Sequence, residues 1–456
     1  MTHPRVISRR SVLAGIALLP AAVPLLTRAA AGAQTSGGAS PYGALQPPDS
    51  LGLMLPEGFT ARVLARAGEV VPTSSYEWHI FPDGGATFAV DDGGWVYASN
   101  SEMPAPGAGG AGALRFDADG EVVDAYPILT GTMTNCAGGA TPWDTWLSCE
   151  EHDAGQVYEC DPFQRGQGEV RPALGRFSHE AAAVDPGRGH VYLTEDEPDG
   201  RFYRFTPDRP GDLSAGGLEV ARVLDDDTVE WLALTDPDAA TTPTRLQVAA
   251  STAFAGGEGI WFADDEVVFV TKLDQKLWSY DIATSRLRVL HDALAVTDAP
   301  VIDGPDNITI SAFGDIIVCE DHGGEPELVI VTADGVVAPI LRQTGEPATE
   351  LAGAAFDPSG TRLYVSSQRA RGGGITYEIA GPFRQPTPPS TTTIATDGGT
   401  TAAADDGDDD GWALPALGGA AAALAVGAGA WWLRTRRGAL GSTATDPDDS
   451  VPRPPA

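Results

Sequence analysis

The chain repeats one pattern six times, in which an apolar strand is followed by polar or acidic residues. The six segments read WVYASNSE (95–102), TWLSCEE (145–151), HVYLTEDE (190–197), VVFVTKLD (267–274), DIIVCED (315–321) and RLYVSSQ (362–368). Most are spaced by roughly 45 to 50 residues, the period of a four-stranded propeller blade, and the wider step before the fourth leaves room for an insertion near residues 207–250. The repeat predicts an all-β fold, a six-bladed β-propeller over residues 50–385.

The residues that open the first strand of each predicted blade are polar, and most are of types that bind metals. They are His79, Cys136, His179, Glu180, Glu258, Asp306, Asn307 and Glu350. Because blades radiate from one axis, these equivalent positions should converge on a single central funnel. Carboxylates crowded there would repel one another and lose hydration unless cations neutralised them. The repeat therefore predicts a metal site on the axis.

The N-terminus, residues 1–33, is predicted to be a twin-arginine signal peptide. Arg9 and Arg10 precede an apolar stretch over residues 14–26 and a small-residue site at 31–33. An ordinary Sec signal peptide with a charged start is the alternative. The twin-arginine route exports proteins that have already folded, often because they load a metal in the cytoplasm, which agrees with a metal-binding funnel.

A second apolar segment, residues 412–433, is 22 residues long and uncharged, which is enough for about 33 Å of helix and one bilayer crossing. Arg434 and two further arginines follow it, so the positive-inside rule places the tail, residues 434–456, in the cytoplasm and the propeller outside the cell membrane. Residues 386–410, rich in Pro, Thr and Asp, predict a disordered stalk. A buried core helix is the alternative for 412–433, but no sequence after it could cover it.

The formal net charge of −34 limits the possible partners. Phosphate backbones and anionic lipid surfaces would be repelled, so the charge argues against nucleic acid as a partner and permits cations. We expect a monomer that acts on a small molecule.

Four cysteines, Cys136, Cys149, Cys160 and Cys319, show no zinc-binding spacing. In an exported chain they would ordinarily be read as disulfides, and Cys149 and Cys160 could pair across adjacent strands of one blade. The sequence leaves that disulfide open. Cys136 opens a first strand and should point at the axis, which favours a metal ligand.

The predicted blades also carry longer motifs. They are NCAGGATPW (135–143), SCEE (148–151), GRFSHE (175–180), YLTED (192–196), DGRFYRF (199–205), GEG (257–259), TK (271–272), WSYD (278–281), PDNI (305–308), CED (319–321) and ELAG (350–353). In this order the motifs resemble the PhoX-type alkaline phosphatases, and the resemblance covers about residues 50–385. It implies a six-bladed propeller that hydrolyses phosphate esters outside the cytoplasm at a mixed iron and calcium cluster.

The resemblance also implies a role for each matching acid. The implied iron ligands are Cys136, Glu151, Glu180 and Glu258. The implied candidates for calcium are Glu102, Glu195, Asp196, Asp306, Glu320, Asp321 and Glu350. A thiolate with carboxylates suits Fe(III), whereas oxygen-only sites suit calcium. Any one of these acids could instead be a solvated turn residue, but acids recur at a similar register in five of the six segments. His179 is more simply a hydrogen-bond partner that orients Glu180.

One position departs from the family pattern that the resemblance implies. An arginine that binds the substrate phosphate is expected two residues before Glu258, where this chain has Gly256. Losing a guanidinium weakens phosphate binding and transition-state stabilisation, so weak phosphatase activity or a different substrate follows. Lys272 or Arg176 could compensate as catalytic residues, and the alternative for Lys272 is a solvated charge at the end of a strand.

Three functions of different classes therefore follow from the sequence. The first is an exported, membrane-anchored, metal-dependent phosphatase. The alternatives are a calcium-dependent esterase or lactonase of propeller type, and a non-catalytic binding propeller whose metals are structural.

Overall fold

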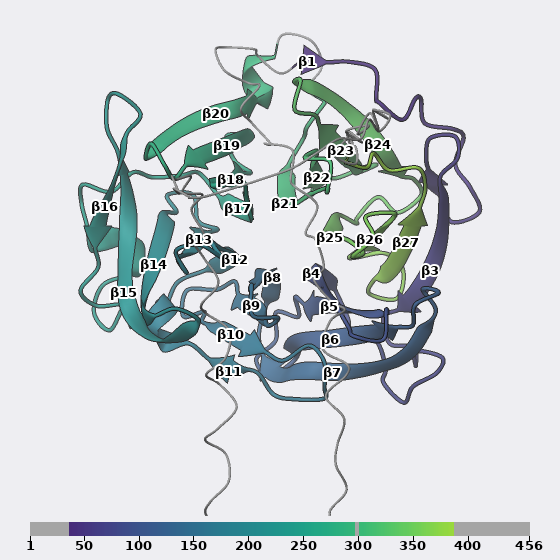
Figure 1. Cartoon of the computed structure of the whole chain (residues 1–456), viewed down its shortest axis with the longest axis horizontal. Helices are drawn as coiled ribbons and strands as arrows, with labels where there is room; N and C mark the ends of the chain where they lie inside the picture. Colours follow the sequence, from purple (N-terminus) through teal and green to yellow (C-terminus); the bar gives the residue numbers. More distant parts are fainter. Residues whose placement is uncertain (1–35, 297–300, 387–456) are drawn as a thin grey trace, which may run out of the picture. The chain divides into compact units, whose positions relative to one another are not determined.

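The computed structural model describes residues 36–296 and 301–386, which form six β-sheets arranged around one axis (Figure 1). Each sheet is one blade, with its first strand innermost. This confirms the predicted all-β six-bladed propeller. The helices in the described part of the chain are three short 3-10 turns: η1 Pro172–Leu174, η2 Thr244–Leu246 and η3 Ala293–Ala295.

Blades 1 to 3 follow one another along the chain. Blade 1 comprises β4 Pro82–Ala89, β5 Trp95–Ser101, β6 Gly109–Phe116 and β7 Val122–Thr132; blade 2 comprises β8 Asn135–Ala140, β9 Trp146–Glu150, β10 Val157–Cys160 and β11 Glu169–Val170; blade 3 comprises β12 His179–Val184, β13 Val191–Glu195, β14 Phe202–Arg209, β15 Asp212–Val223 and β16 Val229–Ala233. The extra strand β16 lies in the predicted insertion.

Blades 4 to 6 complete the ring. Blade 4 comprises β17 Gly257–Ala263, β18 Glu266–Thr271, β19 Lys276–Asp281 and β20 Arg286–Asp292; blade 5 comprises β21 Pro305–Ile310, β22 Ile316–Glu320, β23 Glu327–Val331 and β24 Val336–Gln343, with β1 Ser36–Gly37 and β2 Leu53–Met54 against β24; blade 6 comprises β25 Leu351–Phe356, β26 Arg362–Ser367, β27 Ile375–Ala380 and β3 Thr60–Arg66.

The ring is closed by a strand from the start of the propeller. The strand β3 pairs antiparallel with β27 and so supplies the outer edge of blade 6. Around the axis, the first strands β4, β8, β12, β17, β21 and β25 contact one another in cyclic order. Closure leaves the six inner strands no freedom to separate, and the residues at their ends therefore keep fixed positions.

The core lies between neighbouring blades. Within the described residues it consists of six apolar clusters, each of which joins adjacent sheets. Trp146 of blade 2, for example, packs among Ala86 and Tyr126 of blade 1. A fully buried large apolar side chain contributes roughly 1.5–3 kcal/mol. Trp261 packs against the cluster between blades 4 and 5, and Trp278 packs against the cluster of blades 3 and 4.

The Cys149–Cys160 disulfide that the sequence left open does not form. Cys149 lies opposite Val157 in the β9–β10 ladder, whereas Cys160 lies opposite Trp146. The two cysteines are therefore three ladder steps, about 10 Å, apart and face opposite sides of the sheet, beyond the roughly 7 Å that a disulfide spans. All four described cysteines are free and buried.

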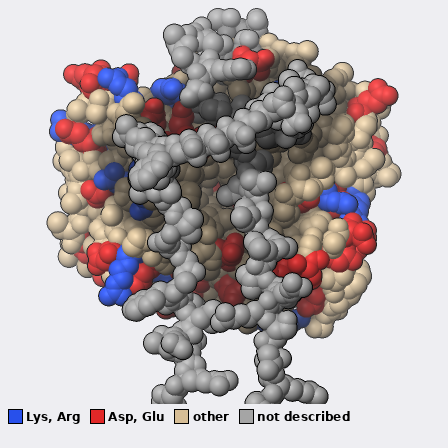
Figure 2. Space-filling view, in the orientation of Figure 1, with Lys and Arg blue, Asp and Glu red and all other residues tan. Residues whose placement is uncertain are grey.

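The predicted signal peptide (1–33), most of the stalk (386–410), the transmembrane segment (412–433) and the cytoplasmic tail (434–456) lie outside the described residues. Within residues 36–296 and 301–386, no helix has the length and apolar character that a membrane crossing needs. Figure 2 shows acidic side chains over the face seen in Figure 1, with Lys and Arg beside many of them.

Glu378 should be important for ring closure. It is almost fully buried on β27, and both its oxygens accept hydrogen bonds from Arg62 of β3 at 3.0 Å, while Arg362 of β26 donates at 2.7 Å. We expect Glu378→Ala to lower the free energy of unfolding by about 2 kcal/mol, because two arginines lose their shared partner. Denaturant unfolding measures the change. In the exposed Arg222–Glu230 pair, Glu230→Ala should change stability by less than about 1 kcal/mol; equal effects of the two substitutions would contradict the closing role.

Candidate metal centre

A β-bulge recurs at one register in every first strand. The ladder to the second strand shifts after Pro82, Asn135, His179, Gly257, Pro305 and Ala352. A bulge leaves one extra residue unpaired and re-aims its side chain. In blades 1 to 5 the residues that follow the shift are Asp83, Cys136, Glu180, Glu258 and Asp306; in blade 6 the equivalent residue is Gly353. Five of the six bulges therefore present a metal-ligating side chain.

A second set of side chains comes from the residue that follows each second strand. These residues are Glu102, Glu151, Asp196, Lys272 and Asp321, and in blade 6 the residue in the same register is Ser367, the last residue of β26. Four of the six are acids. The two sets lie side by side because the paired ends of the first and second strands adjoin at the axis.

Ligand atoms from different blades meet in three groups within the described part of the chain. In each group the donor atoms lie within 4.8 Å of one another; the groups are Cys136, Glu151 and Glu180; Glu180, Glu258 and Asp306; and Asp83, Glu102 and Glu350. Glu180 belongs to two groups. The predicted convergence of Cys136, Glu151, Glu180, Glu258, Asp306, Glu102 and Glu350 is therefore observed.

The acids of these groups are buried, and this determines their electrostatics. Burial, followed by repulsion from neighbouring carboxylates, raises the pKa of Glu180 and Glu258 well above the ordinary value. The same two causes raise the pKa of the Cys136 thiol, whose Sγ lies 3.4 Å from Glu180 Oε1. Such groups ionise together only when a cation is present to compensate their charge.

Two buried carboxylate oxygens without hydrogen bonds in the described part of the chain also indicate that these residues suit metal ions. Glu180 Oε2 and Glu258 Oε1 are buried and have no hydrogen-bond partner among the described residues. Buried carboxylate oxygens are ordinarily hydrogen-bonded. These two oxygens, together with the adjacent thiol, are available as ligands.

Lys272 lies among the acids of blades 4 and 5. Its Nζ is 2.6 Å from Asp321 Oδ2, 3.1 Å from Asp306 Oδ2 and 3.6 Å from Glu258 Oε1. Burial alone would lower the pKa of Lys272, but the three carboxylates raise it above its ordinary value. Lys272 is therefore a fixed positive charge in the funnel and not the solvated strand-end residue of the alternative interpretation.

Arg369 is a second cation in the funnel, which no sequence motif had indicated. It follows β26 of blade 6, contacts Glu350, and donates to Glu102 Oε2 at 3.0 Å. Gln368, next to it, contacts Asp83 and donates to Glu102 Oε2 at 2.9 Å. The side chain of Arg369 is 39% exposed, so its guanidinium reaches both the acids and the solvent.

Four predicted ligands lie outside these groups: Glu195, Asp196, Glu320 and Asp321. Glu195 accepts hydrogen bonds from Arg201 N and from the Tyr203 hydroxyl, and Glu320 accepts from Asp303 N and Glu327 N. Burial raises the pKa of both to about 7. Each is the first acid of a pair, and successive side chains of a strand point to opposite faces. The second acids, Asp196 and Asp321, are therefore the members that face the funnel.

Arg176 and His179 are not members of the three groups of ligating residues. Arg176 donates a long hydrogen bond of 3.4 Å to Gln156 and lines a separate cavity with Asp153 and Arg245. The structure does not bring it to the three groups. His179 is buried, stacks on Phe177, and its Nε2 lies 3.1 Å from Gly175 O. Burial lowers its pKa to about 3, which keeps the ring neutral. Among the described residues Nδ1 has no hydrogen-bond partner, so the expected hydrogen bond from His179 to Glu180 is not observed.

Asp83 is a site residue that the sequence interpretation missed. We expected His79 to open the first blade, but β4 begins at Pro82, and His79 is hydrogen-bonded to Ser99 Oγ at 3.2 Å. A signal was present, because Asp83 precedes Gly84-Gly85-Ala86 much as Cys136 precedes Ala137 and Gly138-Gly139-Ala140. An acid or a thiol directly before a run of small residues is the shared feature that points to Asp83.

Gly256, where the resemblance implies an arginine, adopts a φ of +68°. A Cβ at this position would lie 3.2 Å from Asp196 Oδ1 and 3.2 Å from Leu273 Cγ. A left-handed conformation disfavours other residues. The backbone at this point is therefore suited to glycine.

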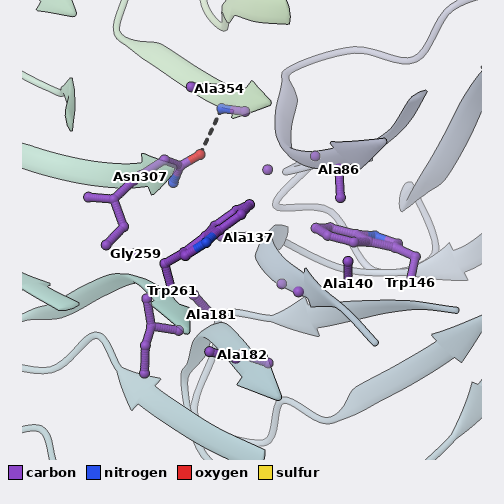
Figure 3. A pocket seen from close by; sticks show the side chains of 18 of the residues that line it. Ala86, Ala137, Ala140, Trp146, Ala181, Ala182, Gly259, Trp261, Asn307 and Ala354 are labelled. Carbon is purple, nitrogen blue, oxygen red and sulfur yellow. Dashed lines mark hydrogen bonds between the residues drawn. The ribbon is translucent and has the colours of Figure 1, made fainter. Parts of the chain in front are cut away.

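Beyond the bulges, the first strands line an apolar axial cavity of about 140 Å³ (Figure 3). Its wall consists of glycines and alanines with Trp146, Trp261 and Asn307, and Asn307 Oδ1 accepts a hydrogen bond from Gly353 N at 2.7 Å. Small residues are required because a Cβ at Gly139 would lie 1.9 Å from Ala182 O. None of the described residues that line this cavity has an ionisable side chain, so the ionisable groups of the axis lie at its bulge end.

Comparison with known proteins agrees with this architecture. The chain is similar to the structure of Pseudomonas fluorescens PhoX in complex with vanadate, a transition state analogue, with 16% identity and a TM-score of 0.58 over 74% of this chain and 97% of that chain. A gluconolactonase from Xanthomonas campestris matches with 14% identity and a TM-score of 0.42 over 75% and 99% of the two chains. No curated protein sequence matches.

The first of these similarities shows the propeller fold alone. The family itself follows from the sequence profile described as Alkaline phosphatase PhoX, which matches residues 96–157, 152–286 and 274–371. These ranges contain five of the six second strands in full and most of the funnel acids. The chain belongs to the PhoX family of alkaline phosphatases.

Proposed function

We propose that this chain is a metal-dependent phosphatase that hydrolyses phosphate esters of small molecules at an iron and calcium centre on the propeller axis. One observation carries the proposal: the Cys136 thiol and two carboxylates, drawn from blades 2 and 3, place their donor atoms within 4.8 Å of one another. Such a concentration of acids is unfavourable without cations. The family supports phosphatase chemistry as the use of those cations.

The chemistry of the donors divides the groups. Cys136, with Glu151 and Glu180, combines a soft sulfur with hard oxygens, which suits iron. Asp83, Glu102 and Glu350 offer oxygens only, which suits calcium. Glu180 can serve two ions, because it belongs to two groups.

When bound, such ions supply Lewis acidity toward a phosphoryl oxygen and lower the pKa of water. The carboxylates and the thiol of this chain hold those charges in place, so Cys136 acts as a ligand and not as a nucleophile. Arg369 presents a partly exposed guanidinium at the same end of the axis, where it can donate hydrogen bonds to a phosphate. We assign to Arg369 the phosphate contact that the resemblance places at position 256, ahead of Lys272 and Arg176.

We also propose that the propeller is exported by the twin-arginine route and anchored on the extracytoplasmic side of the cell membrane. The arginine pair at 9–10 and the uncharged segment 412–433 support this. Protease added to intact spheroplasts should then digest the propeller, and protection of the propeller would contradict the proposed location.

Replacing the thiol tests the metal centre. Cys136→Ser should lose most of its iron and the visible absorption band of a thiolate–iron bond, and it should slow hydrolysis of a chromogenic phosphate ester at least 100-fold, because a missing ligand disturbs the whole cluster. Elemental analysis, absorption spectra and initial rates measure the three effects.

Cys160→Ala is the matched control, because it removes another buried thiol of blade 2 that lies in the core between blades 1 and 2. It should keep iron, absorption band and turnover. Full activity and iron content in Cys136→Ser would contradict the proposal. Turnover of carboxylic esters or lactones without turnover of phosphate esters would favour the esterase alternative, and no turnover of any of them would favour a binding propeller.

The raised pKa values predict a pH dependence of stability. Glu180 and Glu258 keep their protons in the fold above pH 4.5, their ordinary pKa, at which the unfolded chain loses them. The folded state then binds more protons, so the stability of chelator-treated protein should fall as pH rises above that value. Its melting temperature should be lower at about pH 8 than at about pH 5.5.

The variant Glu180→Gln/Glu258→Gln separates this effect from the general charge of the chain. It should lose much of the pH dependence, because its two amides cannot ionise, and metal ions should reduce the dependence of the unmodified protein. An unchanged or rising melting temperature between the two pH values would contradict the assignment of raised pKa values.

A further inference from the structure

Lys272 breaks a regular pattern of acids. It immediately follows β18, and the equivalent residues after the second strands of blades 1, 2, 3 and 5 are Glu102, Glu151, Asp196 and Asp321. Blade 4 therefore places a cation where four other blades place a carboxylate. The substitution reverses the charge at one point of the funnel.

The backbone around Lys272 fixes the side chain in that position. Its N–H donates to Gly256 O at 2.8 Å, and Thr271, just before it, pairs with Gly257 and Lys276 in the ladders of blade 4. The ammonium lies within 3.6 Å of carboxylates from three residues on blades 4 and 5. A metal ion bound by Glu258, Asp306 and Asp321 would need this same space.

Lysine is rare in the chain, so a lysine among the funnel acids is unusual for this sequence. The sequence contains two lysines, Lys272 and Lys276, and uses arginine for its other basic residues. Lys276 lies nearby on β19 and pairs with Asp274 and Asp292, away from the three groups of metal-ligating residues. Only one of the two lysines therefore lies in the funnel. A compact ammonium fits a space of ion size better than a planar guanidinium does.

We propose that Lys272 is a built-in cation that takes the place of one metal ion, and that it limits the number of divalent ions that the funnel binds. This inference rests on the proposed metal centre. In this arrangement Glu180, Glu258 and Asp306 can still bind an ion on the side of blade 3. Asp321 is the ion-pair partner of Lys272 and binds no metal.

Metal stoichiometry tests the inference without reference to activity. Wild type, Lys272→Glu, Lys272→Gln and Lys272→Arg are each saturated with calcium, freed of excess by gel filtration and analysed for calcium and iron per chain. We expect about one additional calcium ion per chain in Lys272→Glu and Lys272→Gln, because the three carboxylates lose their ammonium. Lys272→Arg keeps the charge and should bind the same number of ions as wild type.

Lys276→Glu is the matched control, because it makes the same charge reversal outside the funnel, and its metal content should equal that of wild type. If Lys272→Glu does not fold without calcium, Lys272→Gln provides the second measurement: its melting temperature should rise more on calcium addition than that of wild type.

The outcomes separate the two proposals. Wild type without iron or calcium would overturn the metal centre itself. Wild type with metal, together with an equal or smaller metal content in Lys272→Glu and Lys272→Gln, would overturn the role of Lys272 alone. An equal rise in the melting temperature of Lys272→Gln and wild type would overturn it as well.

Discussion

The structure depends on electrostatic repulsion at the axis, held in check by ring closure. The first strands form a closed cycle, and the bulge near the start of each strand in blades 1 to 5 turns a ligating side chain toward the others. The apolar packing between blades keeps these side chains together although their charges oppose it. The stored repulsion is available as metal affinity, because cations relieve it and the rigid ring prevents the acids from separating.

The ring is not symmetric, because blades 4 and 6 contribute cations where the other four blades contribute acids. Blade 6 has Gly353 at the bulge and Ser367 at the end of its second strand, and it contributes Gln368 and Arg369 instead of a ligand at either position. Blade 4 contributes Lys272. The acids of blades 1, 2, 3 and 5 therefore lie between two cationic sectors, of which that of blade 6 is the more exposed to solvent.

Much of this architecture could be predicted from the sequence. The period of the apolar segments predicted the blades, and the polar residues that open the first strands predicted the convergence of Cys136, Glu180 and Glu258, because both follow from periodicity alone. Finer features depend on register. The bulge decides that Asp83 and not His79 lies in the funnel, strand alternation directs Glu195 and Glu320 away from it, and the β9–β10 ladder separates Cys149 from Cys160. The role of Arg369 was not predictable, because its partners lie in distant segments of the chain.

The most direct test of the account is an anomalous difference map, calculated from crystals of the exported protein with data collected at the iron absorption edge. The account predicts a peak within bonding distance of Cys136 Sγ and a carboxylate oxygen of Glu180. A map with no peak between these two side chains, from protein that is folded and was purified without chelator, would contradict it.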